Sequence, residues 1–305
     1  MNIKLTIIIP HYNYPDGLKR LLETIPDNSE IQVIVVDDKS TKDLDLYEKL
    51  KKEYSVKNVE FYDNTWDKGA GNCRNIGLSK AKGEWYLFAD SDDMFLDGFY
   101  DVVKEYFDKE YDIVAFNPTS RFVDTGKIAK RHEYHLKYYN AYLLNPSVKN
   151  KNAALFHPRT PWSKLIRASL VKDNEIVFDN TRVANDVMFS TKTGVHAKEF
   201  TVDSRIIYCV SDREGSLTTN YDEKTLDIRI GVFIRRYKYL ESHLEKKDFK
   251  NLHLSGLDYY LLALKYKQGL KRIHNLNKMF SKAKVKKIDL SELIKLFRIS
   301  TLKKL

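Results

Sequence analysis

The chain has 305 residues, of which 43% are hydrophobic and 12% aromatic, so it can bury a sizeable core and is not a disordered protein. The formal net charge is +10, but residues 251–305 alone hold 13 Lys and Arg against 3 Asp and Glu, so the rest of the chain is balanced and no nucleic acid is expected as its partner. No apolar run approaches the roughly 20 residues of a membrane-spanning helix.

The cysteines and the start of the chain indicate the compartment. Cys73 and Cys209 offer neither a disulfide framework nor the spacing of a metal site. The short apolar run Leu5–Pro10 has no small-residue cleavage site after it, which argues against a signal peptide. We therefore expect a reducing, cytoplasmic location.

Short apolar runs alternate with helical patterns through the first 118 residues. The expected strands are Leu5–Pro10, Gln32–Asp37, Val59–Tyr62, Trp85–Ala89 and Asp112–Phe116. The expected helices are Asp16–Ile25, Lys42–Tyr54, Ala70–Lys80 and Gly98–Phe107. This alternation predicts an α/β fold, in which helices cover a mostly parallel sheet and ligands bind beyond the carboxyl ends of the strands.

The second part of the chain is harder to read. Residues 120–157 show little periodicity and could form a long active-site loop or helices that the pattern does not reveal. Ordered patterns return at Pro161–Val171 and Ala184–Gly194, and a strand is expected near Val202–Val210. Beyond Asp222 the pattern is mainly helical, so we place a soft domain boundary there.

An acidic cluster, Asp90-Ser91-Asp92-Asp93, follows the fourth expected strand. In an extended chain residues i and i+2 point the same way, so Asp90 and Asp92 can face one ligand. Carboxylates together with diphosphate oxygens suit Mg²⁺ or Mn²⁺. The alternative is an acidic turn that caps the next helix.

Two further segments lie at the same edge of the predicted sheet. Asp37 and Asp38 end the second strand, where they can accept hydrogen bonds from a nucleoside or simply cap a helix. In KGAGNCRNIG, Gly69 and Gly71 begin a helix whose N–H groups face the ligand crevice. Arg74 occupies the third-glycine position of a nicotinamide fingerprint, so that type of site is rejected, and we expect its guanidinium to reach a base or phosphate.

Five segments carry a family resemblance in their order and spacing: IIIPHYN, VVDDKST, KGAGNCRNIGLSKAKGEWYLFADSDD, PWSKLIR and NDVMF. Together, from about Ile7 to Leu217, they resemble the large family 2 of inverting glycosyltransferases, which has the Rossmann-like GT-A fold. The resemblance implies a catalytic domain at residues 1–221, with a nucleotide-binding half at 1–118 and an acceptor half at 119–221. A helical basic region would follow at 222–305.

The resemblance also implies roles for particular residues. The nucleotide-sugar site would be formed by Pro10, His11, Tyr12, Asn13, Asp37, Asp38, Gly69, Arg74, Asp90, Ser91, Asp92 and Arg213. Asp92 would bind the divalent cation, with Asp90 beside it near the ribose. Asp186 would be the catalytic base, although Asn185 stands where the family usually has Glu. The acceptor would meet Trp162, Lys164 and Asn185, but Trp162 is nearly as well explained as a core tryptophan.

The activity implied is transfer of a sugar from a nucleotide-sugar, chiefly a UDP-sugar, to an acceptor hydroxyl. The acceptor would be a lipid-linked glycan in capsule, lipopolysaccharide or O-antigen synthesis, and the cofactor Mn²⁺ or Mg²⁺. One alternative is a sugar nucleotidyltransferase, which normally has a glycine-rich basic loop that this chain lacks after its first strand. The other is a degenerate protein that binds a nucleotide-sugar without turnover.

The C-terminal region has its own pattern. Tyr259–Arg272 and Leu290–Leu305 mix aliphatic, aromatic and basic residues at helical spacing. A basic amphipathic helix of this kind could lie on the anionic inner face of the cell membrane. The alternative is a solvated helical face or a dimer contact. The sequence does not indicate the oligomeric state.

Overall fold

The structure is a computed structural model that describes residues 2–55, 57–212, 222–265 and 269–288. The chain divides into two compact units, Met1–Ser216 and Leu217–Leu305. That the first unit is the catalytic one stays a prediction.

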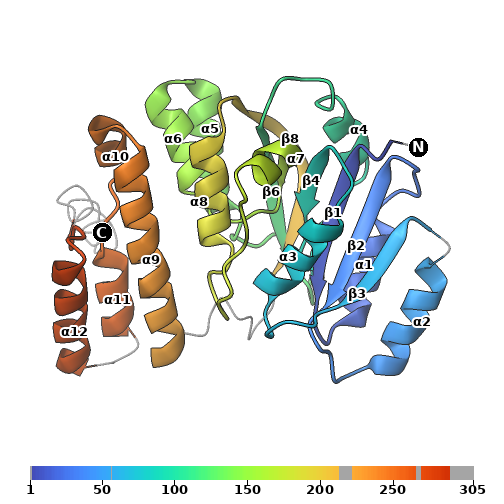
Figure 1. Cartoon of the computed structure of the whole chain (residues 1–305), viewed down its shortest axis with the longest axis horizontal. Coiled ribbons are helices and arrows are strands. Elements are labelled where there is room, and N and C mark those ends of the chain that lie inside the picture. Colours follow the sequence, from blue (N-terminus) through green and yellow to red (C-terminus); the bar gives the residue numbers. More distant parts are fainter. Residues whose placement is uncertain (1, 56, 213–221, 266–268, 289–305) are drawn as a thin grey trace. The chain divides into compact units, whose positions relative to one another are not determined.

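An eight-stranded sheet forms the centre of the first unit, in the order β3-β2-β1-β4-β7-β6-β8-β5 (Figure 1). Its first four strands are parallel and are β1 (Leu5–His11), β2 (Ile31–Asp37), β3 (Val59–Asp63) and β4 (Trp85–Phe88). Every residue of β1, β2 and β4 is buried, as the continuous apolar runs predict. The α/β sheet with flanking helices is therefore confirmed.

The other half of the sheet is mixed. It consists of β7 (Lys164–Arg167), β6 (Ile113–Phe122), β8 (Phe200–Asp212) and β5 (Met94–Phe95). Strand β7 is antiparallel to both neighbours, β8 is parallel to β6, and β5 is antiparallel to β8. The pairing of β5 with β8 matters for function, because it brings the end of β8 beside the acidic turn that follows β4.

Helices cover the sheet of the first unit. They are α1 (Pro15–Glu23), α2 (Leu44–Tyr54), α3 (Ala70–Lys80), α4 (Phe99–Lys104), α5 (Glu133–Leu144), α6 (Val148–Phe156), α7 (Ala168–Asp173) and α8 (Val187–His196). Helix α3 packs on β1 so closely that a Cβ on Gly77 would lie 2.4 Å from Ile8 Cγ2. A side chain at Gly77 would therefore push α3 away from the strand.

The stretch without clear periodicity contains the end of β6 and the helices α5 and α6. Of the two open readings, helices are correct for residues 133–144 and 148–156. The pattern hides α5 because its buried positions are His135 and Tyr139 rather than aliphatic residues. Polar and aromatic residues occupy both sides of this helix, so its hydrophobic period is weak.

The second unit is helical, as expected. Its described helices are α9 (Glu223–His243), α10 (Lys246–Asn251), α11 (Leu257–Lys265) and α12 (Gly269–Lys282). Their apolar residues form a separate core, which includes Phe233, Leu276 and Phe280. Within the described ranges, no helix combines the length and the apolar character that crossing a bilayer requires.

Candidate active site

The loop after β1 is shaped by a buried pair, His11 and Asp37. His11 Nδ1 lies 2.8 Å from Asp37 Oδ1, and the His11 ring stacks on Tyr47 with ring centres 4.7 Å apart. Asp37 also accepts hydrogen bonds from the hydroxyl and the N–H of Ser40. Burial raises the pKa of Asp37, but the hydrogen bonds from His11 and Ser40 outweigh it and leave this pKa below its ordinary value. Both oxygens of Asp37 therefore hold protein groups, which suits a scaffolding role.

Asp38 joins three loops of the crevice. Its N–H donates to His11 O at 2.8 Å, and its Oδ1 accepts from Asn64 Nδ2 at 2.7 Å and from Gly69 N at 2.9 Å. Gly69 has φ +154°, which other residues rarely adopt. The glycine that the sequence marks as a helix start is thus also the backbone donor that fixes Asp38.

Tyr12 and Asn13 follow β1 directly, at the carboxyl end of the sheet. The Tyr12 side chain is 45% exposed, and Lys68 Nζ lies 3.6 Å from its ring centre. A hydrogen bond from Lys68 lowers the pKa of Tyr12. Asn13 accepts hydrogen bonds at its Oδ1 from the N–H groups of Thr41 and Lys42. Lys68 thus covers one face of the Tyr12 ring, while Tyr12 as a whole stays partly exposed at the carboxyl end of the sheet.

Arg74 connects distant parts of the site. Its Nη2 donates to Asp90 Oδ1 at 2.5 Å, and its Nη1 donates to Asn185 Oδ1 at 2.9 Å. The guanidinium carbon also lies 5.3 Å from the centre of the Phe178 ring. The structure thus adds a contact that the sequence pattern does not reveal, because Arg74 links the acidic turn to the residue before Asp186.

Residues 174–186 lie against helix α3 and are here called the base loop, because their last residue, Asp186, is the predicted base. A Cβ on Gly71 would lie 2.3 Å from Asp179 O. Asn75 holds the Phe178 backbone with two hydrogen bonds, accepting from its N–H at 2.8 Å and donating to its carbonyl at 3.0 Å. Asn72 donates to Asn180 Oδ1 at 2.9 Å. Sequence reasoning missed Asn72 and Asn75, although their spacing of three residues on a helix was a usable signal.

Asp186 ends the base loop and is the N-cap residue of α8. Its side chain is half-buried, and burial raises its pKa although Arg74 opposes the shift. Lys164 on β7 is buried and donates to Pro158 O at 2.7 Å. Burial lowers the pKa of Lys164 to about 7, with Asp186 acting in the opposite direction. A carboxylate with a raised pKa is a better proton acceptor than an ordinary one.

The four residues of the acidic turn differ in their surroundings. Asp90, Ser91 and Asp92 are partly exposed, whereas Asp93 is only 3% exposed. Asp93 Oδ1 accepts from Ser211 N at 2.7 Å and its Oδ2 accepts from the Tyr208 hydroxyl at 2.8 Å. Burial, with Asp92 and Asp90 nearby, raises the pKa of Asp93 well above its ordinary value. Sequence reasoning gave Asp93 no separate role.

The carboxylates of the acidic turn suit a hard cation that takes some of its ligands from the protein and the others from a bound substrate. Asp90 and Asp92 offer carboxylate oxygens at the carboxyl edge of the sheet. Across the residues described here, no three His, Cys, Asp or Glu side chains gather into a metal cage. Mg²⁺ is commonly held by one or two carboxylates, with phosphates and water completing its shell, so this pair is sufficient.

The remaining predicted residues have varied positions. Pro10 and Asn185 are buried, and Trp162, only 5% exposed, stacks on Tyr208 and packs beside His135. Most of the Trp162 ring thus contacts protein, and its meeting with an acceptor stays a prediction. Arg213 lies outside the described residues, and so does Leu290–Leu305, one of the two segments in which the sequence predicts a basic amphipathic helix.

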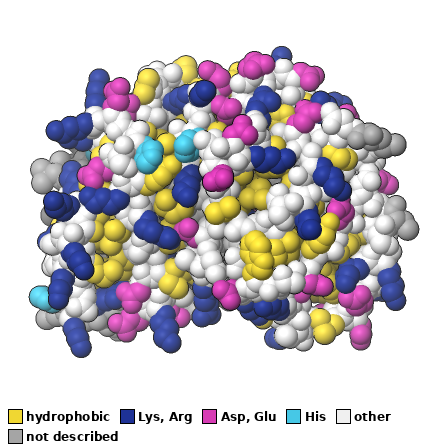
Figure 2. Space-filling model, in the orientation of Figure 1, with side chains coloured by type: hydrophobic (Ala, Val, Ile, Leu, Met, Phe, Trp, Pro, Cys, Tyr) yellow, Lys and Arg dark blue, Asp and Glu magenta, His cyan; other side chains and the backbone are white. Residues whose placement is uncertain are grey.

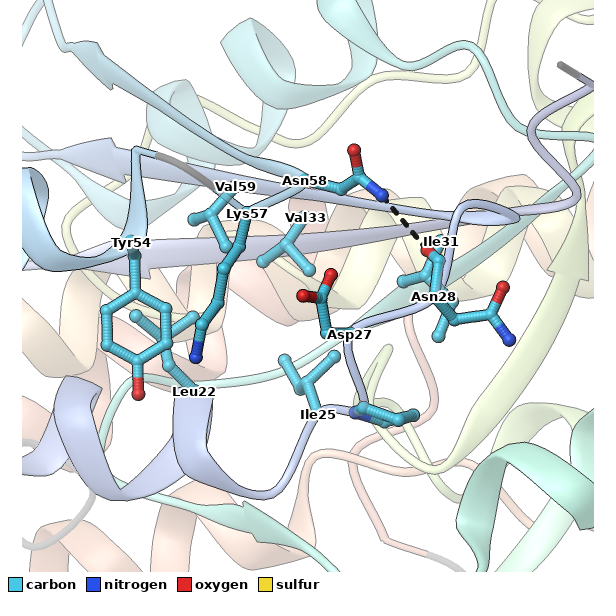
Figure 3. A pocket seen from close by; sticks show the side chains of 11 residues that line it. Leu22, Ile25, Asp27, Asn28, Ile31, Val33, Tyr54, Lys57, Asn58 and Val59 are labelled. Atoms are coloured by element: carbon cyan, nitrogen blue, oxygen red, sulfur yellow. Dashed lines mark hydrogen bonds between the residues drawn. The ribbon is translucent and has the colours of Figure 1, made fainter.

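One hollow of the first unit lies away from these residues. It is lined by Leu22, Ile25, Pro26, Asp27, Asn28, Ile31, Val33, Tyr54, Lys57, Asn58 and Val59 (Figure 3). Ile31 and Val59 begin strands β2 and β3, so the hollow is at the amino ends of the strands. The candidate residues are at the carboxyl ends, and none of them lines it.

Comparison with known proteins adds independent information. The family described as Glycosyl transferase family 2 matches residues 6–174, more than half of the chain. The poly(ribitol-phosphate) beta-N-acetylglucosaminyltransferase TarS of Staphylococcus aureus is 27% identical over 230 residues, covering 70% of this chain and 36% of the relative. The poly(ribitol-phosphate) beta-glucosyltransferase of Bacillus spizizenii is 30% identical over 213 residues, covering 68% of this chain and 32% of the relative. The chain thus spans about a third of the length of these relatives.

Solved structures share the fold. S. aureus TarS 1-349 in complex with UDP-GlcNAc has a TM-score of 0.65 and 23% identity, covering 82% of this chain and 70% of that one. The mannosyltransferase PcManGT from Pyrobaculum calidifontis, in complex with GDP-Man and Mn²⁺, has a TM-score of 0.61 and 14% identity, covering 99% and 81%. At these identities the likeness concerns the fold alone.

Proposed function

Because the chain belongs to glycosyl transferase family 2, we propose that it is a metal-dependent inverting glycosyltransferase that moves a sugar from a UDP-sugar to an acceptor hydroxyl. The observation that carries this proposal is the linkage of Asp90 to Asn185 through Arg74. It ties the carboxylates suited to a cation to the loop that ends at Asp186. The proposed sugar transfer uses both of these parts, the carboxylates that would hold a cation at the diphosphate and the base that would accept the proton of the acceptor.

In the proposed reaction Asp186 accepts the proton of the acceptor hydroxyl while that oxygen forms a bond to the anomeric carbon. The bond from this carbon to the diphosphate breaks on the opposite face, so the anomeric configuration inverts and UDP leaves with the electron pair. A cation bound by Asp92 and Asp90 would neutralise charge on the departing diphosphate. A second carboxylic acid of the glycosidase type is then unnecessary.

The donor is proposed to be a UDP-sugar. In support, the nucleotide bound by the structurally similar S. aureus TarS is UDP or UDP-GlcNAc. Tyr12 and Asp38 would hold the nucleoside, the first by stacking on the base and the second by accepting hydrogen bonds. Arg74 would act on the diphosphate indirectly, by holding Asp90.

The acceptor is proposed to be a hydroxyl of a cell-surface polymer that is carried on a lipid. The names of the two bacterial relatives, which act on poly(ribitol phosphate), support a polymer of this general class. The half of the first unit that follows residue 118 would receive it, with Lys164 and Trp162 shaping the acceptor side of the site.

The second unit is proposed to associate with an anionic surface through lysines. Lys271, Lys278 and Lys282 are exposed and recur seven and four residues apart, so they share one face of α12. Leu276 and Phe280 of the same helix are fully buried in the core of this unit and cannot insert into a bilayer while it is folded. Lys and Arg side chains are frequent over the helices of the second unit (Figure 2), so the attraction between this unit and an anionic surface would be electrostatic.

Calorimetric titration with UDP tests the nucleotide site. We expect binding that is strengthened by Mn²⁺ in the wild type, and an Asp92→Ala variant that loses the Mn²⁺ effect. An unchanged Mn²⁺ effect in Asp92→Ala would contradict the metal assignment. Binding of UDP-sugars without release of UDP, with or without acceptor extracts, would favour the degenerate, non-catalytic alternative.

A further inference from the structure

We infer that the hydroxyl of Tyr208, together with Asp93, is a positioning device for the acidic turn, and that the affinity of the site for a metal-bound diphosphate depends on it. This inference rests on the proposed function. Neither residue is among those that the sequence assigns to the site. Both adjoin the two residues proposed to hold the cation, because the Tyr208 hydroxyl bonds to the Asp90 backbone and Asp93 directly follows Asp92.

Tyr208 contacts the acidic turn twice through one hydroxyl. The hydroxyl oxygen accepts a hydrogen bond from the N–H of Asp90 at 2.9 Å, and its proton is donated to Asp93 Oδ2 at 2.8 Å. The turn is closed on itself by a bond of 3.0 Å from Asp93 N to Asp90 O. One group on β8 therefore fixes the first and last residues of the turn.

Asp93 connects the acidic turn to a second residue of β8, Ser211. Its second oxygen accepts from the N–H of Ser211 at 2.7 Å, and Arg131 Nη1 donates to the carbonyl of the same residue at 2.8 Å. Each Asp93 oxygen thus has a partner on β8, so this carboxyl is held against that strand. Three carboxylates in four residues repel one another, and this arrangement leaves Asp90 and Asp92 on the partly exposed side.

The Tyr208 ring has little freedom to move. It is fully buried, it stacks on Trp162 with ring centres 5.7 Å apart, and it packs edge-on against Phe95 at 5.4 Å. Phe95 is also opposite Tyr208 in the pairing of β5 with β8. Because the ring is held from two sides, its hydroxyl is a fixed reference point for the Asp90 backbone.

This arrangement differs from ordinary core packing because it constrains the two residues proposed to bind the cation, Asp90 and Asp92. Tyr208 bonds to the backbone of Asp90, and Arg74 bonds to the side chain of the same residue at 2.5 Å. Asp93 directly follows Asp92. A loosened turn would change the separation of the Asp90 and Asp92 carboxylates, and with it their fit to a cation. Groups that orient metal ligands typically contribute about 10- to 100-fold to metal affinity.

Tyr208→Phe tests the inference, with Tyr139→Phe as its matched control. Tyr139 is likewise fully buried in the first unit, but its hydroxyl has no hydrogen-bond partner among the described residues. Each variant removes one buried hydroxyl and keeps the ring. UDP affinity is measured by calorimetry with and without Mn²⁺, and the thermal midpoint is recorded for each protein.

We expect Tyr208→Phe to lose about tenfold or more of the UDP affinity that Mn²⁺ adds, with metal-free UDP binding unchanged. Tyr139→Phe should match the wild type in both. Equal Mn²⁺ effects in the two variants would overturn the inference while leaving the proposed function standing. A wild type without any Mn²⁺ effect would overturn the proposed metal dependence, and the inference with it.

A second variant keeps the test valid if Tyr208→Phe does not fold. Asp93→Asn retains an oxygen for the Ser211 N–H but can present an amide donor to Tyr208. It should show the same selective loss of the Mn²⁺ effect. A folded Asp93→Asn protein with a wild-type Mn²⁺ effect would count against the inference.

Discussion

Arg74 donates a hydrogen bond of 2.9 Å to the side-chain oxygen of Asn185, a residue 111 positions further along the chain. This bond joins helix α3 to the base loop, which ends at the proposed base. Asn185 stands where the family usually has a glutamate, and its neutral amide accepts from Arg74 without adding a negative charge beside Asp186. The proposed base therefore experiences the positive charge of Arg74 together with the negative charge of Asp90.

Replacing Asn185 with aspartate should alter the pH dependence of catalysis. A new carboxylate next to Asp186 disfavours ionisation of the base and raises its pKa further. Because the base must be ionised to accept a proton, the acid side of the kcat/KM profile should move to higher pH. Asn185→Gln adds no charge, so the acid limb of its kcat/KM profile should lie at the same pH as that of the wild type. An unshifted acid limb in Asn185→Asp would show that Asp186 does not control the rate.

Replacing Asp186 with asparagine should separate catalysis from binding. Loss of a general base typically lowers the rate by about 10²- to 10⁴-fold, whereas UDP binding should change little because Asp186 is proposed to act on the acceptor hydroxyl rather than on the nucleotide. Transfer is measured as acceptor-dependent release of UDP, and binding by calorimetry. Transfer at the wild-type rate would remove Asp186 from the mechanism.

Replacing Gly71 with alanine should destabilise the first unit. The added Cβ would lie 2.3 Å from Asp179 O and 3.0 Å from the Asn185 Cβ, so the base loop must shift. Overpacking of this kind costs about 1–3 kcal/mol. Gly231→Ala is a suitable comparison, because nothing lies within 4 Å of a Cβ there and alanine favours a helix. Thermal unfolding should show a lower midpoint for Gly71→Ala and no loss for Gly231→Ala.

Asp37 should make folding stability depend on pH. Its folded pKa is lowered, so the stability it contributes is present above its unfolded pKa of about 3.9 and is lost as the pH falls through the folded value. The free energy of unfolding of Asp37→Asn should therefore lie furthest below that of the wild type near neutral pH. The difference should shrink below about pH 4. A difference that stays constant from pH 7 to pH 3 would contradict this account.

The lysine face of α12 can be tested with vesicles. A triple Lys→Gln variant at Lys271, Lys278 and Lys282 should weaken binding to anionic phosphatidylserine vesicles, since each lysine near such a surface contributes about 1 kcal/mol. A triple variant at the exposed residues Lys246, Lys247 and Lys250 of α10 changes the net charge equally and is the control. Equal losses in the two variants would indicate a general charge effect rather than this face.

Features that depend only on neighbouring residues can be predicted from the sequence of this chain. Apolar runs predict β1 to β4 to within a residue or two at each end, and the helical pattern predicts α3 with the bounds it has in the structure, Ala70–Lys80. The acidic cluster, the paired aspartates after β2 and the glycines of α3 were visible as chemistry-bearing groups at one edge of a sheet. Local periodicity is sufficient here because burial on a strand or helix repeats along the chain.

The contacts of each of these groups follow from the tertiary structure and not from the local sequence. The sequence could not separate Asp93, which is buried against Tyr208 and Ser211, from the partly exposed Asp90 and Asp92. It also could not show that Arg74 bridges Asp90 and Asn185, because such partners meet only after strands and helices far apart in sequence have packed. Periodicity encodes which face of an element is buried, whereas hydrogen-bond partners more than 100 residues apart are set by the topology of the whole sheet.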